Sequence, residues 1–170
     1  MIIMGVAGSG KTTVGQQVAS ALGYEFADAD DFHSVANKEK MAGGHPLTDA
    51  DREPWLAAVR NHIERRVKDG AKIVVACSAL RESYRRELMP DDTPAAHTQF
   101  VYLQVSEQVT ADRLRARHAH FMKVDMLRSQ FATLEAPTEH DAWIVDASLP
   151  VAEVVNRICQ KLRSDFQQKI

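Results

Sequence analysis

The feature that most constrains this chain is a glycine-rich loop near its start, between a short apolar run and a helical pattern. Residues 2–4 are apolar, residues 5–12 read Gly-Val-Ala-Gly-Ser-Gly-Lys-Thr, and residues 11–22 have the spacing of an amphipathic helix. This order matches strand, G-x-x-x-x-G-K-[ST], helix, in which glycines let successive backbone N–H groups point at phosphate oxygens. The sequence therefore predicts a phosphate-binding loop (P-loop) for a nucleotide.

Individual residues of this loop have separate expected tasks. The N-terminus of the following helix adds partial positive charge. We expect Lys11 to reach the β- and γ-phosphates of ATP and the Thr12 hydroxyl to bind Mg²⁺. The predicted ATP-binding residues of the loop are Gly5, Val6, Ala7, Gly8, Ser9, Gly10, Lys11, Thr12 and Thr13.

The rest of the chain alternates short apolar runs with helical patterns. Strands are expected at 2–4, 24–27, 72–76, 99–105 and 143–145, and helices at 34–41, from Thr48, at 81–89, from 106 to about 118 and from Pro150. Thr48 with Asp51 resembles a capping box, and Gly23 suits a helix C-terminus. This alternation predicts a three-layer α/β P-loop kinase fold, a five-stranded parallel sheet flanked by helices, with a mobile helical lid.

Composition narrows the class of protein further. The 170 residues fit a single domain, spanning 1–170, and a formal net charge of −2 argues against nucleic acid or an anionic membrane as partner. No apolar run approaches the roughly 20 residues of a membrane span. Cys77 and Cys159 lie far apart and are expected to be reduced core residues. Without a recognisable leader at the N-terminus, we expect a cytoplasmic protein.

Other classes of P-loop protein lack support in the sequence. A GTPase would need D-x-x-G, which is absent, and N-K-x-D, which Asn37-Lys38-Glu39-Lys40 fails to match. A motor-type ATPase would normally end a central strand in an acid, but residues 76–78 read Ala-Cys-Ser. A small-molecule kinase therefore fits better.

An acidic pair follows the expected strand at 24–27. Asp28 and Asp30 stand at the carboxyl end of that strand, where open α/β sheets place ligands, and would point the same way if the strand continued. Asp28 is expected to hold Mg²⁺ through water, and Asp30 to accept the proton of an attacking hydroxyl. The alternative is a cluster that only caps the helix that follows.

A basic helix follows the fourth expected strand. Arg113 and Arg117 are four residues apart and so share one helix face. We expect them to contact phosphates when a mobile lid at about 119–137 closes and excludes water. The alternative is a solvated basic surface. His118 and His120 are expected to be polar lid residues rather than metal ligands.

Five blocks in order resemble the gluconate kinases of the shikimate-kinase-like P-loop group, over essentially the whole chain. The blocks are G-V-x-G-S-G-K-[ST] at 5–12, D-x-D-x-x-H-x-x-x-N-x-x-K-M at 28–41, G-x-P-L-x-D-x-D-R-x-P-W-L at 44–56, C-S-A-L-[KR]-x-x-Y-R at 77–85, and R-L-x-x-R-x-x-H-F with Q-F-x-x-L-E at 113–135. The blocks at 44–56 and 77–85 are specific, whereas the first is generic. Asp31 and Ser34 depart from the aromatic residue and proline usual there, which leaves open whether Asp30 or Asp31 meets the substrate.

The resemblance implies that the chain transfers the γ-phosphate of ATP to the 6-hydroxyl of D-gluconate, as a homodimer with Mg²⁺. Its catalytic residues would then be Lys11, Asp30 and Arg117. Two alternatives remain: a related kinase for shikimate or a nucleoside monophosphate, and a nucleotide-binding regulator without turnover.

An acid substrate needs a cation to bind its carboxylate. Arg85 and Arg81, four residues apart after the third strand, are expected to supply it, with Arg85 the first choice. Arg52 and His33 are further candidates for the substrate's hydroxyls or carboxylate. The alternative for the arginine pair is a surface helix salt-bridged to Glu82 and Glu87.

Overall fold

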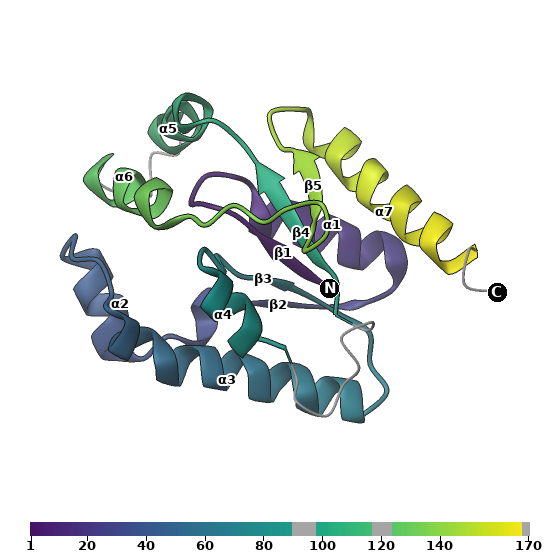
Figure 1. Cartoon of the computed structure of the whole chain (residues 1–170), viewed down its shortest axis with the longest axis horizontal. Coiled ribbons are helices and arrows are strands. Elements are labelled where there is room, and N and C mark those ends of the chain that lie inside the picture. Colours follow the sequence, from purple (N-terminus) through teal and green to yellow (C-terminus); the bar gives the residue numbers. More distant parts are fainter. Residues whose placement is uncertain (90–97, 117–123, 168–170) are drawn as a thin grey trace.

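The computed structural model describes residues 1–89, 98–116 and 124–167. Its centre is a sheet of five parallel strands in the order β2-β3-β1-β4-β5 (Figure 1). The strands are β1 Ile2–Met4, β2 Glu25–Asp28, β3 Ile73–Ala76, β4 Phe100–Gln104 and β5 Trp143–Asp146. The predicted five-stranded parallel sheet is confirmed.

Helices cover both faces of this sheet. They are α1 Lys11–Leu22, α2 Val35–Ala42, α3 Asp49–Lys68, α4 Glu82–Glu87, α5 Glu107–Ala116, α6 Val124–Thr133 and α7 Val151–Gln167, with a 3₁₀ turn η1 at Ala29–Phe32. Helices α1 and α7 pack together on one face, and α3 with α4 lies on the other (Figure 1). This three-layer arrangement confirms the predicted α/β class.

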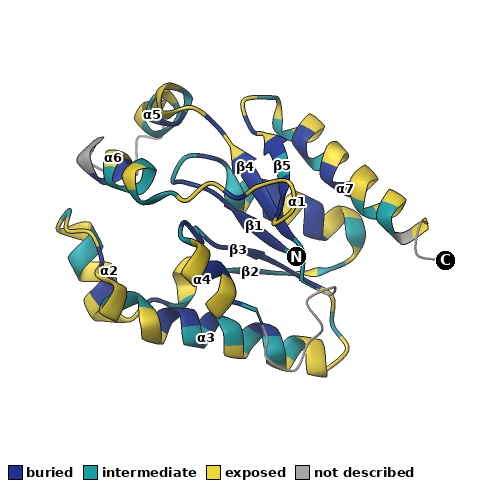
Figure 2. Ribbon diagram, viewed as in Figure 1, coloured by how far each residue is buried: buried dark blue, intermediate teal, exposed yellow. Residues whose placement is uncertain are grey.

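Alternate residues of the central strand β1 divide the core into two parts. Ile2 and Met4 pack in the cluster that contains Trp55 of α3, while Ile3 packs with Val14 of α1. Side chains along a strand alternate between faces, so a strand covered on both sides is apolar at every position. Strands β1, β3 and β4 are accordingly mostly buried in Figure 2, whereas the edge strand β2 is partly exposed. Because helices cover both faces of the sheet, the polar loops lie at the carboxyl ends of the strands.

Local signals in the sequence are realised at the helix ends. The Thr48 side chain accepts from the Asp51 backbone N–H, the Asp51 carboxylate accepts from the Thr48 N–H, and α3 begins there. Gly23 ends α1 with φ of 66°. Pro90, Arg117, His118 and His120 lie outside the described residues. None of the helices within the described ranges is both long and apolar enough to cross a lipid bilayer.

Candidate active site

The glycine-rich loop connects β1 with α1 and presents its backbone to a cavity. Gly8 has φ of +77°, and a Cβ there would lie 3.1 Å from the Thr110 carbonyl oxygen. Both observations require glycine, because other residues strain at positive φ and α5 passes too close for a side chain. The loop thus has the tight backbone that a phosphate-binding site needs.

Two side chains at the start of α1 are held close to this loop. Lys11 Nζ donates to the Val6 carbonyl oxygen at 3.0 Å. Thr12 Oγ1 donates to Asp28 Oδ2 at 2.7 Å, which joins the P-loop helix to the end of β2. An ammonium group therefore stands over the loop, and a hydroxyl–carboxylate pair lies beside it.

Asp28 ends β2, and the strand does not continue to Asp30. The chain turns instead into η1, where Asp28 Oδ1 accepts from the Asp30 backbone N–H at 3.0 Å. The condition under which the two carboxylates would point the same way is therefore not met, because a 3₁₀ turn replaces the alternation of a strand. Asp28 caps η1 and also accepts from Thr12, whereas the helix that follows, α2, is capped by Ser34. Asp30 lines the cavity, whereas the exposed Asp31 does not.

The pair Thr12 and Asp28 fits a magnesium ion bound mainly by nucleotide. Its hydroxyl hydrogen points at a carboxylate, which leaves the Thr12 oxygen lone pairs available to a hard cation. Within residues 1–89, 98–116 and 124–167, no group of three or more His, Cys, Asp or Glu side chains could hold a metal ion. Phosphate oxygens and water would have to supply the remaining ligands, which is usual for Mg²⁺.

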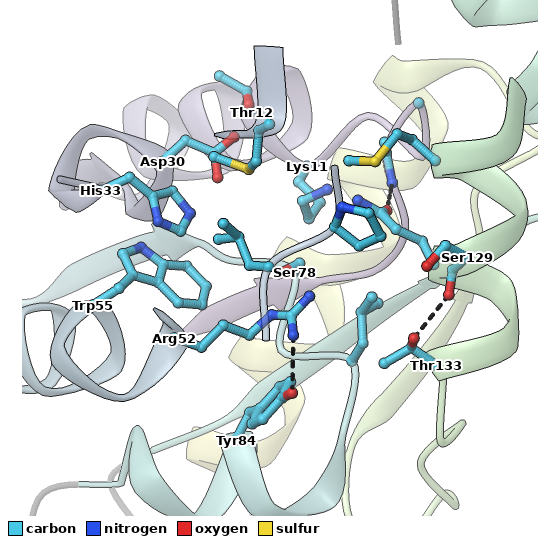
Figure 3. Close-up of a pocket in the computed structure, with 18 of the residues that line it drawn as sticks. Lys11, Thr12, Asp30, His33, Arg52, Trp55, Ser78, Tyr84, Ser129 and Thr133 are labelled. Carbon is cyan, nitrogen blue, oxygen red and sulfur yellow. Dashed lines mark hydrogen bonds between the residues drawn. The ribbon is translucent and has the colours of Figure 1, made fainter. Parts of the chain in front are cut away.

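The loop, η1, α3 and α6 together enclose a cavity of about 260 Å³. In Figure 3, Lys11 and Thr12 lie across it from Arg52 and Tyr84, with Asp30 and His33 at one side. Its lining residues are Ala7, Gly8, Gly10, Lys11, Thr12, Thr13, Asp30, His33, Met41, Pro46, Leu47, Arg52, Trp55, Ser78, Leu80, Tyr84, Leu114, Met126, Ser129, Gln130 and Thr133. The predicted residues Lys11, Asp30, His33 and Arg52 therefore meet in one space.

His33 is held flat against Trp55 at the wall of this cavity. The ring centroids are 4.4 Å apart and the planes differ by 12°, while Trp55 Nε1 donates to the Ala29 carbonyl oxygen at 2.7 Å. Burial lowers the pKa of His33 below its usual value, and the nearby Asp30 opposes this only in part. A neutral imidazole at pH 7 offers one donor and one acceptor, which suits hydroxyl groups.

Arg52 belongs to a small charged cluster with Asp49, Tyr84 and Arg81. Arg52 Nη1 donates to the Tyr84 hydroxyl at 3.3 Å and lies 3.7 Å from Asp49, while Arg81 Nη1 donates to Asp49 at 2.8 Å. The Tyr84 hydroxyl donates to Asp49 and thereby lowers the pKa of that carboxyl, with the two arginines adding to the effect. Of the two arginines, only Arg52 lines the cavity.

Arg85 is not brought to the cavity. Its side chain is buried, with the residue 7% exposed, and Nη1 donates to the carbonyl oxygens of Ala79 at 3.1 Å and Leu80 at 3.3 Å. Ala79 has a positive φ of 43°, which is unfavourable for a residue with a Cβ. The guanidinium therefore holds a strained turn between β3 and α4 and does not line the cavity. The prediction that Arg85 faces the substrate carboxylate does not fit this geometry.

A second cavity of about 290 Å³ lies on the other side of the loop. Arg113 of α5 spans it, donating to the Ala147 carbonyl oxygen at 2.7 Å and the Ser9 carbonyl oxygen at 3.5 Å. Apolar residues from α1, the β5–α7 turn and α7 complete the lining, including Val14, Leu149 and Val151. Gly8 and Gly10 line both cavities, so the loop separates two adjoining compartments.

Helix α6 closes the first cavity opposite His33 and Trp55. Its polar residues Ser129 and Thr133 lie on that side in Figure 3, and Gln130 Oε1 accepts from the Ala7 backbone N–H at 2.6 Å. This helix lies within the expected lid, but Arg117 and residues 119–123 are outside the described residues. Four residues without a predicted role also line this cavity: Trp55, Ser78, Tyr84 and Gln130. All four residues belong to the sequence blocks that resemble the gluconate kinases, and this membership could have identified them as site residues.

Comparisons with known proteins place this site in a family. A family model described as Shikimate kinase matches residues 7–163. A gluconokinase of Gluconobacter oxydans (strain 621H) is 47% identical over 144 residues, which is 85% of this chain and 79% of that protein.

Solved structures are similar over the same extent. The crystal structure of a gluconokinase from Sinorhizobium meliloti 1021 matches with a TM-score of 0.81 and 40% identity, covering 96% of this chain and 95% of that one. An unliganded sugar kinase from Janibacter sp. HTCC2649 matches with a TM-score of 0.86 and 38% identity, covering 95% and 92%. The fold and the order of the site-bearing elements are therefore shared with these kinases.

Proposed function

The chain belongs to the shikimate kinase family and, within it, to the gluconokinases, and we propose that it transfers the γ-phosphate of ATP to the 6-hydroxyl of D-gluconate. The observation that carries this proposal is one cavity lined by a phosphate loop with its lysine, and also by a carboxylate, an imidazole and a guanidinium. The products are ADP and 6-phospho-D-gluconate. Phosphoryl transfer depends mainly on positioning and charge neutralisation, which this arrangement supplies.

On the phosphate side, the loop amides and Lys11 would hold the β- and γ-phosphates. Mg²⁺ would bind the Thr12 oxygen and lie within reach of Asp28 through water, and it would neutralise charge on the bridging oxygens. The second cavity would take the nucleoside, with Arg113 at its edge. This assignment puts the γ-phosphate at the point where the two cavities adjoin.

On the acceptor side, Asp30 would act as the general base. Its carboxylate would take the proton of the 6-hydroxyl while that oxygen forms a bond to the γ-phosphorus, and the bond from phosphorus to the bridging oxygen would break to release ADP. Support comes from its position in η1, where it lines the cavity two residues beyond the Asp28–Thr12 pair. Asp31 lacks that position.

We assign the substrate carboxylate to Arg52 in place of Arg85 or Arg81. Arg52 lines the cavity, whereas Arg81 and Arg85 do not, and the Arg85 guanidinium donates to two backbone carbonyls. A guanidinium binds a carboxylate through parallel N–H donors, and the Tyr84 hydroxyl already orients this one. His33 would then hydrogen-bond hydroxyl groups between the two ends of the substrate.

Three further properties belong to the same proposal. A lid at about 119–137, which contains α6, would close over both substrates and bring Arg117 to the phosphates. Protease nicking within the lid should slow when ATP and gluconate are both bound. Dependence on ATP and a sugar acid supports action in the cytoplasm, and the resemblance to gluconate kinases supports a homodimer. A sedimentation mass of one chain would contradict the dimer.

The test compares D-gluconate with sorbitol, which has the same terminal hydroxyl but no carboxylate, at saturating ATP. Because sorbitol cannot make the charge-assisted pair with the Arg52 guanidinium, kcat/KM for sorbitol should be lower by roughly 10²-fold. Arg52→Met should remove most of that preference and leave the KM for ATP nearly unchanged. Shikimate and nucleoside monophosphates should be poor acceptors. Equal use of gluconate and sorbitol by the unmodified protein would refute the acid substrate.

A further inference from the structure

The block around Gln130 and Glu135 has no role in the mechanism above, although it forms one wall of the first cavity. The described residues of α6 that line this cavity are Met126, Ser129, Gln130 and Thr133. Their spacing of three, four and seven residues places them on one face of the helix. This face is uncharged, whereas Arg128 is exposed and lies 3.7 Å from Glu107. Such a wall suits hydroxyl groups better than phosphates.

The orientation of the Gln130 side chain follows from its contact with the phosphate loop. Ala7 offers a backbone N–H, so the atom facing it at 2.6 Å must be the amide oxygen. The Nε2 group of the same amide is then a pure donor at the cavity wall, and no residue in the described part of the chain accepts from it. Such a donor is available to an oxygen atom of a ligand in this cavity.

The position of this contact distinguishes the acceptor from the nucleoside. Ala7 and Gln130 line the first cavity, together with Asp30 and Arg52, and neither lines the second. Gly8 and Gly10, by contrast, border both cavities. The donor therefore belongs to the acceptor compartment, at the end of it that adjoins the phosphate loop.

The chain just after α6 is also bonded to the β3–α4 turn, another part of the lining of the first cavity. Just beyond α6, the Glu135 N–H donates to the Leu80 carbonyl oxygen at 2.9 Å, and its carboxylate accepts from the Glu82 N–H at 2.6 Å. The β3–α4 turn held in this way supplies Ser78 and Leu80 to the cavity. Two contacts, one with the phosphate loop and one with the β3–α4 turn, thus fix the position of the Gln130 amide.

We propose that Gln130 is an acceptor-binding residue, whose Nε2 donates to an oxygen of the polyhydroxy acid while its Oε1 stays on the Ala7 N–H. This assignment rests on the proposed function. It adds a donor from α6 that aligns the acceptor with the phosphate loop. The acceptor is then bound by Gln130 as well as by Asp30 and Arg52. In this assignment Gln130 holds the Ala7 N–H and the other loop amides hold the phosphates, so nucleotide binding does not depend on the Nε2 donor.

Two variants distinguish the role of the amide oxygen of Gln130 from that of its amide nitrogen. Gln130→Met keeps the length of the side chain and removes both donor and acceptor. Gln130→Glu keeps an oxygen for the Ala7 N–H but loses the Nε2 donor. Arg128→Gln, on the outer face of α6, is the matched control, and thermal unfolding of each variant reports folding. Steady-state kinetics with D-gluconate varied at saturating ATP, and then with ATP varied, give the two KM values.

Both Gln130 variants should raise the KM for gluconate by roughly tenfold, the size expected for one lost hydrogen bond. The KM for ATP should stay within about twofold in Gln130→Met, and Arg128→Gln should match the unmodified protein. A normal gluconate KM in Gln130→Glu but not in Gln130→Met would overturn the proposal, since only the Ala7 contact would then matter. A changed KM for ATP alone would overturn it as well. An unmodified protein that phosphorylates no sugar acid would instead overturn the proposed function and this inference together.

Discussion

The phosphate-binding loop is formed by eight consecutive residues and acts mainly through backbone N–H groups. The acceptor wall, which is the part of the first cavity that contains Asp30, Arg52 and Gln130, is instead formed by single side chains from distant elements. Asp30 comes from η1, Arg52 from α3 and Gln130 from α6, and all three line one cavity. The phosphate-binding loop can bind phosphate once its own backbone conformation has formed. The acceptor wall exists only when the sheet and helices bring separate parts of the chain together.

This difference affects how each region responds to substitution. In the loop, glycine is required by positive φ and close packing, as at Gly8. At the acceptor wall, the placement of a side chain depends on partners such as Trp55 for His33 and Tyr84 for Arg52. We therefore expect loop substitutions to impair the transfer of phosphate itself, and acceptor-wall substitutions to impair the choice and alignment of the acceptor.

The largest effect should come from Lys11. Lys11→Ala should leave the fold intact and lower kcat/KM by roughly 10³-fold or more, because the charge that develops on the phosphates loses its cation. Coupled measurement of ADP release with gluconate, alongside the far-ultraviolet circular dichroism spectrum, tests this. Activity near that of the unmodified protein would show that the loop lysine is not the phosphate cation.

Asp30 should give a smaller effect of a different kind. Asp30→Asn should lower kcat by roughly 10²-fold or more with little change in ATP affinity, since a general base is lost and the phosphate side is untouched. Asp31→Asn is the matched control, because Asp31 is adjacent but does not line the cavity. If Asp31→Asn is the crippling change, the two residues exchange roles.

Arg85 should affect stability rather than the choice of acceptor. Arg85→Met should lower the free energy of unfolding by about 1–3 kcal/mol, because the carbonyl oxygens of Ala79 and Leu80 lose a buried donor. Arg86→Met, at an exposed position paired with Glu82, should change it by less than about 0.5 kcal/mol. Urea unfolding measures both. If Arg85→Met is stable but no longer prefers gluconate to sorbitol, Arg85 and not Arg52 binds the substrate carboxylate.

Much of the fold was predictable because its signals are local. The alternation of apolar runs with helical patterns predicted the five parallel strands, and Thr48 with Asp51 marked the start of α3. The end of β2 was harder to predict. Whether a strand continues or turns after Asp28 depends on a cap that the same aspartate provides, so Asp28 and Asp30 have different surroundings.

By itself, the sequence determined the phosphate loop, the class of fold and the resemblance to gluconate kinases, because these depend on neighbouring residues, on hydrophobic period and on ordered motifs. Only the tertiary structure decided the strand order β2-β3-β1-β4-β5 and which cations reach the acceptor cavity. Arg81 and Arg85 share a helix spacing that suits a ligand fork, yet the buried Arg85 binds the Ala79 turn and Arg81 does not line the cavity. Helical spacing determines which side chains share a face, but the partners that pack against that face determine which of them remains available to a ligand.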